Sequence, residues 1–398
     1  MTKELEDDLR RVIGRAAETA PQAPSGLSAA IVGRSRRRRA RTLAAVTALA
    51  VAVVAGGVSV TVRDLGDDSA HLAVNPVPSP QESQAAQEGR PAPVEEVWPN
   101  AVWKIPAKLS DGRKFQPLLF IDDRTILLST WSSFDKADAI HAYDLGTGDV
   151  RKIADIRTPK GVFASGYAVG EGRVVWQTVR NRRTEFWSVP ITGGEPTAIA
   201  TDAPVEGGTD ASAVVAGKLA FSLVKGGVFT LPLDGGQVTP VAGADRHHIL
   251  RWPWVGTPGD YTPDNEPSFE ELLNVETGET SKALVRPGEK FVRCGVTTCV
   301  GTGADEKYFH RLRDGSQQRE LPQWAALGLA YDRFMAIHLP MPTGGQALLD
   351  LTTGKSGDLG LRPDAKGGSV SVQPGLTGNR LVSYPLGDQY VIIDLLRI

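Results

Sequence analysis

The stretch that decides the fold is "AYDLGTGDV", residues 142–150. Tyr143 and Leu145 alternate with polar residues, and Thr147-Gly148 then interrupts the alternation. A period of two is typical of a half-buried strand, and a Gly-containing break between two such runs predicts a tight turn. The stretch therefore predicts a β-hairpin, and the architecture depends on whether this hairpin recurs.

The hairpin recurs along the chain. Related stretches are "WSVPITGGE", "TLPLDGGQ", "LLNVETGET", "HRLRDGSQ" and "LLDLTTGKS". The turn glycines are Gly148, Gly193, Gly235, Gly278, Gly315 and Gly354, at spacings of 45, 42, 43, 37 and 39 residues. A seventh copy, "VIIDLLRI", starts at Val391 and runs to the end of the sequence before its turn. Similarity at a near-constant period indicates a repeat architecture rather than a two-sheet sandwich.

A second marker precedes the hairpin in most copies: a turn, a basic residue and then apolar residues, as in "DDRTILL". The basic residues are Arg124, Arg173, Lys218, Arg333 and Arg380. The marker is missing from the fourth copy, and "CGVTTC" replaces it in the fifth. Two hairpin turns per copy imply four strands, which is the blade of a β-propeller. We therefore predict an all-β, seven-bladed β-propeller over residues 98–398, with six or eight blades as alternatives because the fourth copy is irregular.

The two ends of the predicted ring complement each other. The last copy has residues for a third strand, 390–394, but none for a fourth, whereas "AVWKIPA", residues 101–107, is a strand without a partner. We predict that this N-terminal strand closes the last blade, because an open ring would leave a strand edge and apolar faces in water.

Residues 42–62 predict a single transmembrane helix. These 21 residues carry no charge, and as a helix they would be roughly 31 Å long, enough to cross a bilayer. Residues 1–41 have a net charge of +5 and residues 63–398 have −7. Since arginine-rich flanks stay cytoplasmic, we expect a single-pass cell-membrane protein with its N-terminus inside and its propeller extracytoplasmic. A cleaved export signal of the twin-arginine type, loosely matched by Ser35-Arg36-Arg37, is the alternative.

The segments on either side of the span differ in character. Residues 1–41 form the expected cytoplasmic segment, in which residues 3–18 predict a short amphipathic helix. This helix would lie on the membrane surface or dock to a cytoplasmic partner. Residues 63–97 contain five prolines among Gln, Ser, Ala and Glu, which predicts a stalk without a core.

The hairpin "YDLGTGDVRKI" and the turn "DDRTILL" resemble TolB-type and WD40-like propeller repeats. The whole plan, over about residues 36–398, is similar to that of actinobacterial membrane-anchored propeller proteins. The resemblance implies a binding scaffold rather than a particular ligand. The helix before the span also resembles the cytoplasmic ends of membrane-bound anti-sigma regulators, although no cysteine precedes Cys294 to supply a zinc site there.

Candidate site residues are few. Cys294 and Cys299 are the only cysteines, and outside the membrane such a pair predicts a disulfide across a hairpin turn. The candidate ligand contacts are the aromatic pair Trp252 and Trp254 and the tandem pair His247 and His248. For the tryptophans, packing between adjacent blades is the alternative. Adjacent histidines on a strand point to opposite faces and do not easily share a metal.

No catalytic residue, metal or other cofactor is predicted, because the sequence holds no GxxxxGK, GxSxG or HExxH motif. The arginine run beside the span is not read as a nucleic-acid site. The sequence favours a membrane-anchored propeller that binds or senses a peptide, glycan or protein at the cell envelope. The alternatives are an extracytoplasmic enzyme acting on glycans, with carboxylates from different blades, and an envelope sensor with a cytoplasmic, anti-sigma-like partner.

Overall fold

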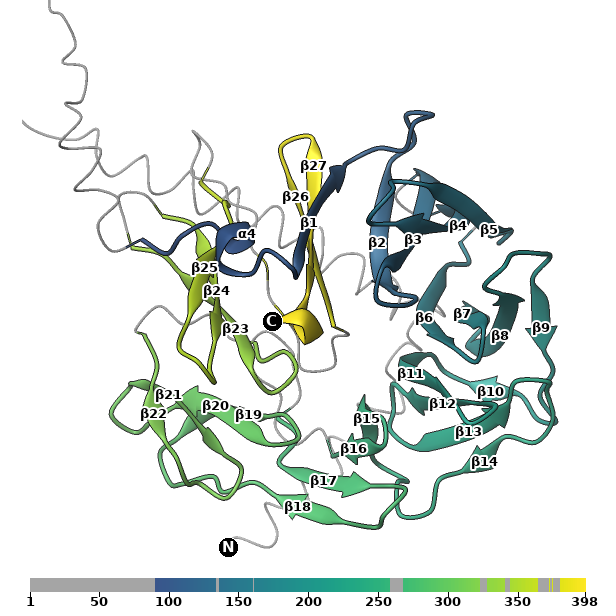
Figure 1. The fold of residues 1–398 in the computed structure, drawn as a ribbon. Helices are drawn as coiled ribbons and strands as arrows, with labels where there is room; N and C mark the ends of the chain where they lie inside the picture. The colour runs from purple at the N-terminus through teal and green to yellow at the C-terminus, as the bar shows by residue number, and fades with distance from the viewer. Residues whose placement is uncertain are drawn as a thin grey trace, which may run out of the picture. The chain divides into compact units, whose positions relative to one another are not determined.

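The computed structural model describes residues 90–133, 136–159, 161–257, 268–322, 328–340, 344–363, 372, 374 and 380–398. The chain divides into two units between Val77 and Pro78, and all described residues belong to the second. Seven antiparallel sheets surround a common centre as the blades of a β-propeller (Figure 1). The predicted cytoplasmic segment, residues 1–41, and the predicted span, residues 42–62, lie outside the described residues. Within the described part, no helix is long and apolar enough to cross a bilayer.

Blades one to five each contain at least four strands, and the first strand of each lies nearest the centre of the ring (Figure 1). Blade one is β2 (Phe115–Phe120), β3 (Thr125–Ser133), β4 (Lys136–Asp144) and β5 (Val150–Asp155). Blade two is β6 (Ala164–Gly170), β7 (Arg173–Arg180), β8 (Arg183–Pro190) and β9 (Thr197–Ile199), with β10 (Val205–Glu206) also paired to β8. Blade three is β11 (Thr209–Val215), β12 (Lys218–Leu223), β13 (Val228–Pro232) and β14 (Thr239–Pro240). Blade four is β15 (His248–Arg251), β16 (Trp254–Gly256), β17 (Glu271–Asn274) and β18 (Thr280–Lys282). Blade five is β19 (Lys290–Cys294), β20 (Thr298–Thr302), β21 (Tyr308–Leu312) and β22 (Arg319–Glu320).

Blades six and seven show three strands each among the described residues. Blade six is β23 (Phe334–His338), β24 (Gln346–Asp350) and β25 (Ser356–Asp358); blade seven is β26 (Leu381–Leu386), β27 (Gln389–Asp394) and β1 (Val102–Pro106). The marker residues Arg333 and Arg380 directly precede β23 and β26, as Arg124 precedes the second strand of blade one.

The ring closes as the sequence predicted. Strand β1 pairs antiparallel with β27, from Val102 opposite Ile393 to Pro106 opposite Gln389. The last blade thus combines the N-terminal and C-terminal ends of the propeller, and the blade count is seven. Ile105 of β1 and Ile392 of β27 share a buried core with Phe115 of blade one. Apolar packing therefore continues across the junction.

The propeller begins earlier than the predicted residue 98. Asp358 of β25 donates its backbone N–H to the carbonyl of Ala92 at 2.8 Å, and the short helix α4 (Val94–Val97) follows. Val94 is 1% exposed and shares a core with Trp98 and with residues of blades six and seven. Gly357 allows this approach, because a Cβ there would lie 2.9 Å from the Trp98 ring. The sequence places residues 90–97 in the stalk, and the structure corrects this: they cover blade six because their apolar side chains complete its core.

One hydrogen bond recurs in all seven blades and unites the two sequence markers. In blade one, Leu145, which follows the third strand, donates its backbone N–H to the carbonyl of Arg124 at 2.9 Å. In blade four, which lacks the basic marker, Val275 donates to Pro253 at 3.0 Å. The other five donors are Ile191, Leu233, Arg313, Leu351 and Leu395, which donate to Gly172, Gly217, Thr297, Arg333 and Arg380. The bond holds each pair of turns together at one end of its blade.

The turn glycines adopt the backbone conformation that their positions require. Gly148 has φ +79°, and the other five also have positive φ. This left-handed region costs glycine nothing and strains other residues, so glycine recurs at each turn.

Arginine–aspartate pairs strengthen some of these turns. Arg333 donates Nε and Nη2 to the two carboxylate oxygens of Asp350, at 2.8 and 2.7 Å. Asp350 is 1% exposed, and its burial by itself would raise its pKa, but hydrogen bonds from Arg333 and Thr353 hold the pKa below its usual range. In blade one, Arg124 donates Nε to Asp144 at 2.9 Å, and this pair is exposed to solvent. The same turn is thus supported by a buried pair in one blade and by an exposed pair in another.

The closing strand generates a first prediction. A chain that starts at Arg90 should fold as a monomer, because it keeps every contact of Val94, Trp98 and β1. A start at Pro99 should lower stability by about 3 kcal/mol, since a large buried aromatic is lost. A start at Lys108 should aggregate, because the edge of β27 is then unpaired. Light scattering after gel filtration and thermal unfolding measure these outcomes; equal melting temperatures for the Arg90 and Pro99 starts would contradict the docking of residues 90–98.

The buried and exposed pairs generate a second prediction. Asp350→Asn should destabilise the protein by about 3 kcal/mol, because it removes one partner of a largely buried ion pair. Asp144→Asn is the matched control in the same turn of another blade, and it should cost less than about 1 kcal/mol because water screens the exposed pair. Denaturant unfolding of both variants measures the difference, and equal costs would show that burial does not set the strength of these pairs.

Candidate functional site

The candidate site is a pocket between blades one and two, which we call the tryptophan pocket. It has a volume of about 360 Å³. Its inner wall is formed by Trp176 and Trp187 with the hydroxyl of Thr178, and its rim carries charged side chains. It is bounded by the segment that follows the outer strand of blade one and by β7 and β8 of blade two.

The hairpin of blade two positions both tryptophans. Trp176 of β7 lies directly opposite Trp187 of β8, and residues directly opposite each other in an antiparallel pair share one face of the sheet. That face packs against blade one, where Trp176 is 3% exposed and belongs to a core with Ile140. Trp187 is half-buried, and its Nε1–H donates to Thr178 Oγ1 at 3.1 Å. This bond fixes the orientation of the indole that a ligand would touch.

The rim of the tryptophan pocket carries both signs of charge. Asp155 is held by Lys152, with 2.5 Å between Nζ and Oδ1, and the hydrogen bond from Lys152 lowers its pKa. Arg180, Glu185 and Glu195 are exposed, and within the described part of the chain none of them has an ion-pair partner. An aromatic wall with charged groups of both signs at its edge suits a ligand with an apolar body and polar or zwitterionic ends.

The sequence analysis did not predict this pocket. The contribution of blade two nevertheless has a local sequence signal, the tight turn of its hairpin. The two-residue turn Asn181-Arg182 has positive φ at both positions, 51° and 64°, as expected for a tight hairpin turn. That turn fixes the register of β7 and β8 and hence the pairing of Trp176 with Trp187. The contribution of blade one has no such local signal.

The structure places Trp252 and Trp254 on opposite sides of blade four. Trp252 packs against the core shared by blades three and four, and its Nε1–H donates to Glu276 Oε1 at 3.0 Å. Trp254 packs against the core that links blades four, five and six. The two rings therefore take part in packing between blades, which was the alternative interpretation, and they do not line one pocket together.

The two histidines also have separate surroundings. His248 begins β15 and is buried, and its Nδ1 is hydrogen-bonded to Asp210 of blade three. Asp210 in turn accepts a hydrogen bond from Ser222 Oγ at 2.6 Å, so this trio ties blades three and four. His247 precedes the strand and is half-buried, and burial lowers its pKa. Across the described ranges, no group of three or more His, Cys, Asp or Glu side chains is arranged to hold a metal.

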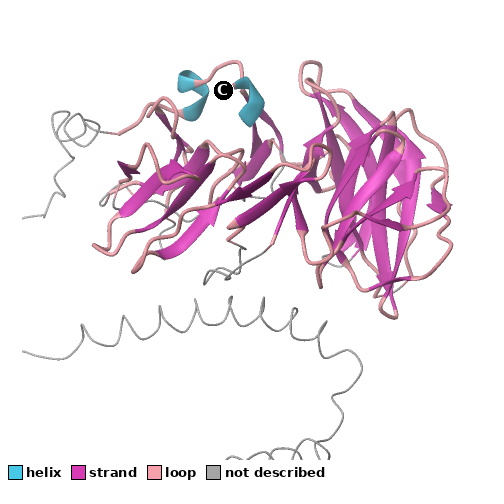
Figure 2. Cartoon of the chain, turned by 90° about the horizontal axis from the view of Figure 1, so that it is seen from below, coloured by secondary structure: helices cyan, strands magenta, loops and turns pink. Residues whose placement is uncertain are grey.

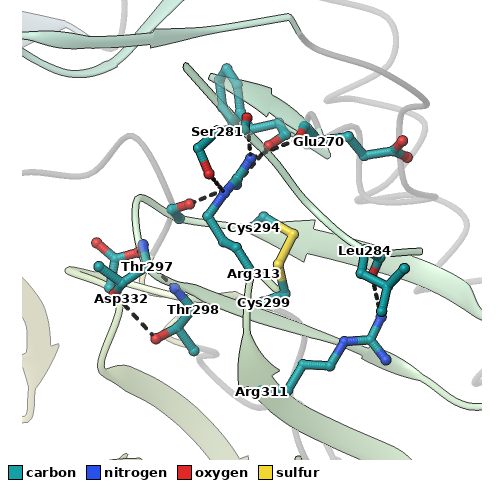
Figure 3. Close-up of a disulfide and its surroundings, with 12 residues drawn as sticks. Glu270, Ser281, Leu284, Cys294, Thr297, Thr298, Cys299, Arg311, Arg313 and Asp332 are labelled. Atoms are coloured by element: carbon teal, nitrogen blue, oxygen red, sulfur yellow. Dashed lines mark hydrogen bonds between the residues drawn. A yellow bond between two sulfur atoms is a disulfide. The ribbon is translucent and has the colours of Figure 1, made fainter. Parts of the chain in front are cut away.

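The predicted disulfide joins Cys294 of β19 to Cys299 of β20 (Figure 3). The two residues lie directly opposite each other across the hairpin, and both side chains are buried. Together with Val292 and Phe309 of blade five and with Ala283, which follows β18 of blade four, they form a small buried core. The bridge therefore stabilises the blade in which "CGVTTC" replaces the basic marker.

Arg313 lies beside the disulfide (Figure 3). It occupies a position that is apolar in the other blades. It follows the third strand of blade five, at the position that Leu or another aliphatic residue occupies in the other six blades. Its buried guanidinium donates to the carbonyls of Phe269 at 3.0 Å, Glu270 at 2.6 Å and Gly295 at 2.9 Å. Burial lowers its pKa to about 10, so it stays charged at neutral pH. Arg313 thus joins blades four and five by hydrogen bonds where the other blades use apolar contact.

Comparison with known proteins finds only distant matches, and these are among solved structures. No family model matches the sequence, and no curated protein matches it. Similar solved structures include YCF48 bound to a D1 peptide, at 10% identity and a TM-score of 0.46, covering 76% of this chain and 96% of that one. An oligogalacturonate lyase from Vibrio parahaemolyticus has 12% identity and a TM-score of 0.44, covering 74% and 97%. A putative TolB from Agrobacterium tumefaciens has 11% identity and a TM-score of 0.34, covering 74% and 97%. At these values the likeness concerns the fold alone.

Arg313 generates a third prediction. Arg313→Met should destabilise the protein by about 3 kcal/mol, because several buried carbonyls lose their donor. Hydrogen exchange should rise in β17 and β19, whose ends flank those carbonyls. Arg319→Met, on the exposed outer strand of the same blade, is the matched control and should change neither quantity. Unchanged exchange in β17 and β19 of the Arg313 variant would contradict the role of Arg313 as the tie between the blades.

Proposed function

We propose that this protein is a membrane-anchored β-propeller that binds a ligand at the outer side of the cell membrane, with the tryptophan pocket as its contact site. The observation that supports this most directly is the combination of two paired indoles with three rim charges that have no ion-pair partner among the described residues. Unpaired charges beside an aromatic wall are groups that a ligand can satisfy on binding.

The size and chemistry of the pocket favour a short peptide segment or a glycan unit. A volume of about 360 Å³ lies at the small end of ligand pockets, so it fits one or two residues or a single sugar ring. Trp187 offers a half-exposed indole face for stacking. Arg180 and Glu185, which lie on the same face of the neighbouring strands β7 and β8, would pair with the carboxylate and amine of a zwitterionic fragment.

The membrane anchor and the envelope location rest on the sequence. The uncharged stretch 42–62 follows six arginines between positions 34 and 41 and precedes an acidic bulk, the charge order of a helix whose N-terminus stays inside. The similarity of this plan to membrane-anchored propellers of actinobacteria supports the same arrangement. In this arrangement, residues 3–18 would be available to a cytoplasmic partner.

Ligand binding generates a fourth prediction. The full chain, purified in detergent, should retain a peptide or glycan fragment from a cell-wall digest and release it chemically unchanged. Trp187→Ala should weaken this binding by about tenfold or more, because the stacking surface is lost. Trp252→Ala, which removes an equally large ring from a packing position, is the control and should leave the affinity unchanged. Calorimetric titration measures the affinity, and mass spectrometry of the released fragment measures turnover.

Two outcomes would overturn this proposal. Equal affinity for both tryptophan variants would mean that the ligand binds elsewhere. Steady conversion of the fragment to a product would place the protein among the enzymes, the alternative that the sequence left open.

The anchor generates a fifth prediction. Protease added outside intact spheroplasts should remove the propeller and leave a small membrane-bound N-terminal fragment that contains residues 1–62. Mass spectrometry of the membrane fraction identifies that fragment. A mature chain that begins beyond residue 62 would instead show a cleaved export signal and no anchor.

A further inference from the structure

A second pocket lies at the seam where the ring closes, and we call it the seam pocket. It has a volume of about 500 Å³. Its walls come from three parts of the chain: the end of β1 with the segment after it, the first two strands of blade one, and the β26–β27 turn of blade seven. The side chains that decide its chemistry are Lys108, Lys114, Phe115, Trp131, Asp388 and Tyr390.

One side of the seam pocket is aromatic. The ring of Phe115 lies 5.3 Å from the ring of Tyr390, so blades one and seven meet through an aromatic pair. Phe115 is buried, whereas Tyr390 and Trp131 are half-buried and present part of their rings to the pocket. This side suits a flat apolar group.

The other side carries two lysines that face each other. Lys108 and Lys114 are partners in an antiparallel bridge, an arrangement in which like charges repel. Both are exposed, and among the described residues neither has an acidic side chain within ion-pair distance. The acid between them in sequence, Asp111, is engaged by Arg113 at 2.6 Å. Asp388 also lines the pocket, and its single negative charge offsets only one of the two lysines. The pocket therefore keeps a net positive charge.

The seam pocket also spans the pairing of β1 with β27, where the two ends of the propeller meet. Beside it, Ala107 donates its backbone N–H to the carbonyl of Asp388 at 2.8 Å, next to the last β1–β27 pair, Pro106 and Gln389. A ligand that touches Lys108 and Tyr390 therefore touches both ends of the propeller. Anything that binds the closed ring more tightly than the open one stabilises closure.

We infer that the seam pocket binds an organic carboxylate with an aromatic body and that this binding stabilises the closure of the ring. The carboxylate would lie between Lys108 and Lys114, where it relieves their repulsion, and the aromatic ring would lie against Trp131 and Tyr390. Such a group occurs on free aromatic acids and at the C-terminus of a peptide that ends in an aromatic residue. This inference is independent of the tryptophan pocket, which lies on the other side of blade one.

The test uses the full chain in detergent and three probes. N-acetylphenylalanine carries the carboxylate and represents a peptide end, phenylacetate represents a free aromatic acid, and N-acetylphenylalaninamide is the neutral match of the first. At least one of the two acids should bind by calorimetry, raise the melting temperature and slow hydrogen exchange in β1, whereas the amide should do none of these. Tighter binding of N-acetylphenylalanine would assign the peptide end, and tighter binding of phenylacetate the free acid.

Variants separate the site from a general effect on folding. Lys108→Gln combined with Lys114→Gln should weaken binding of the acid by about tenfold or more, because both charged donors are lost. Without ligand this variant should melt at the same temperature as the unmodified protein or higher, since a repulsion is removed. Lys225→Gln, an exposed lysine of blade three, is the control and should bind normally. Equal binding of acid and amide, no binding of either acid, or loss of binding in Trp187→Ala instead would each overturn the inference.

Discussion

The pairing of β1 with β27 is the constraint on which the rest of the structure depends. Among the described strands, those of each other blade follow one another along the chain, whereas β1 and β27 pair residues almost 300 positions apart. Bringing such distant residues together costs conformational entropy. Contacts that no single blade provides must offset that cost. They come from both sides of the seam: Phe115 with Tyr390, and Arg380 of blade seven, which donates to Asp123 of blade one at 3.0 Å. Docking of residues 90–98 on blade six adds a third set.

Within each blade, a single backbone hydrogen bond between two turns provides the repeating unit, and the side chains around it vary. Where the bond is flanked by an Arg–Asp pair, as in blades one and six, the sequence shows a clear repeat. Blade four makes the same bond from Val275 to Pro253 without any basic residue, and blade five makes it from Arg313. The repeat looked irregular in these two copies because backbone atoms carry the bond, while the side chains that identify the repeat are free to change. In blade five the disulfide and the buried guanidinium compensate for a small core (Figure 3).

Both pockets lie between blades, on either side of blade one. Figures 1 and 2 show how the blades themselves are arranged. This follows from the architecture: a propeller blade buries its two faces against its neighbours, so a hollow forms where facing side chains do not fill the space. Their chemistry differs because the neighbours differ. At the tryptophan pocket, two indoles of one hairpin meet the end of β5 and the segment after it, in which Asp155 and Arg157 alternate with apolar residues. At the seam pocket, the meeting partners are the two ends of the propeller, and two lysines that repel each other lie beside aromatic rings.

The sequence by itself determined the hairpins, the seven copies, the strand that closes the ring and the disulfide. Each of these rests on local chemistry: a period of two, glycine at a positive-φ turn position, an unpaired strand at each end and two cysteines across a four-residue turn. The tertiary structure alone decided that residues 90–97 belong to the propeller, that Trp252 and Trp254 pack on opposite sides of blade four, and that Trp176 and Trp187 line a pocket. Those facts depend on how one blade faces the next. Contacts between blades join residues from different repeats and follow no period along the chain, so no local pattern could reveal them.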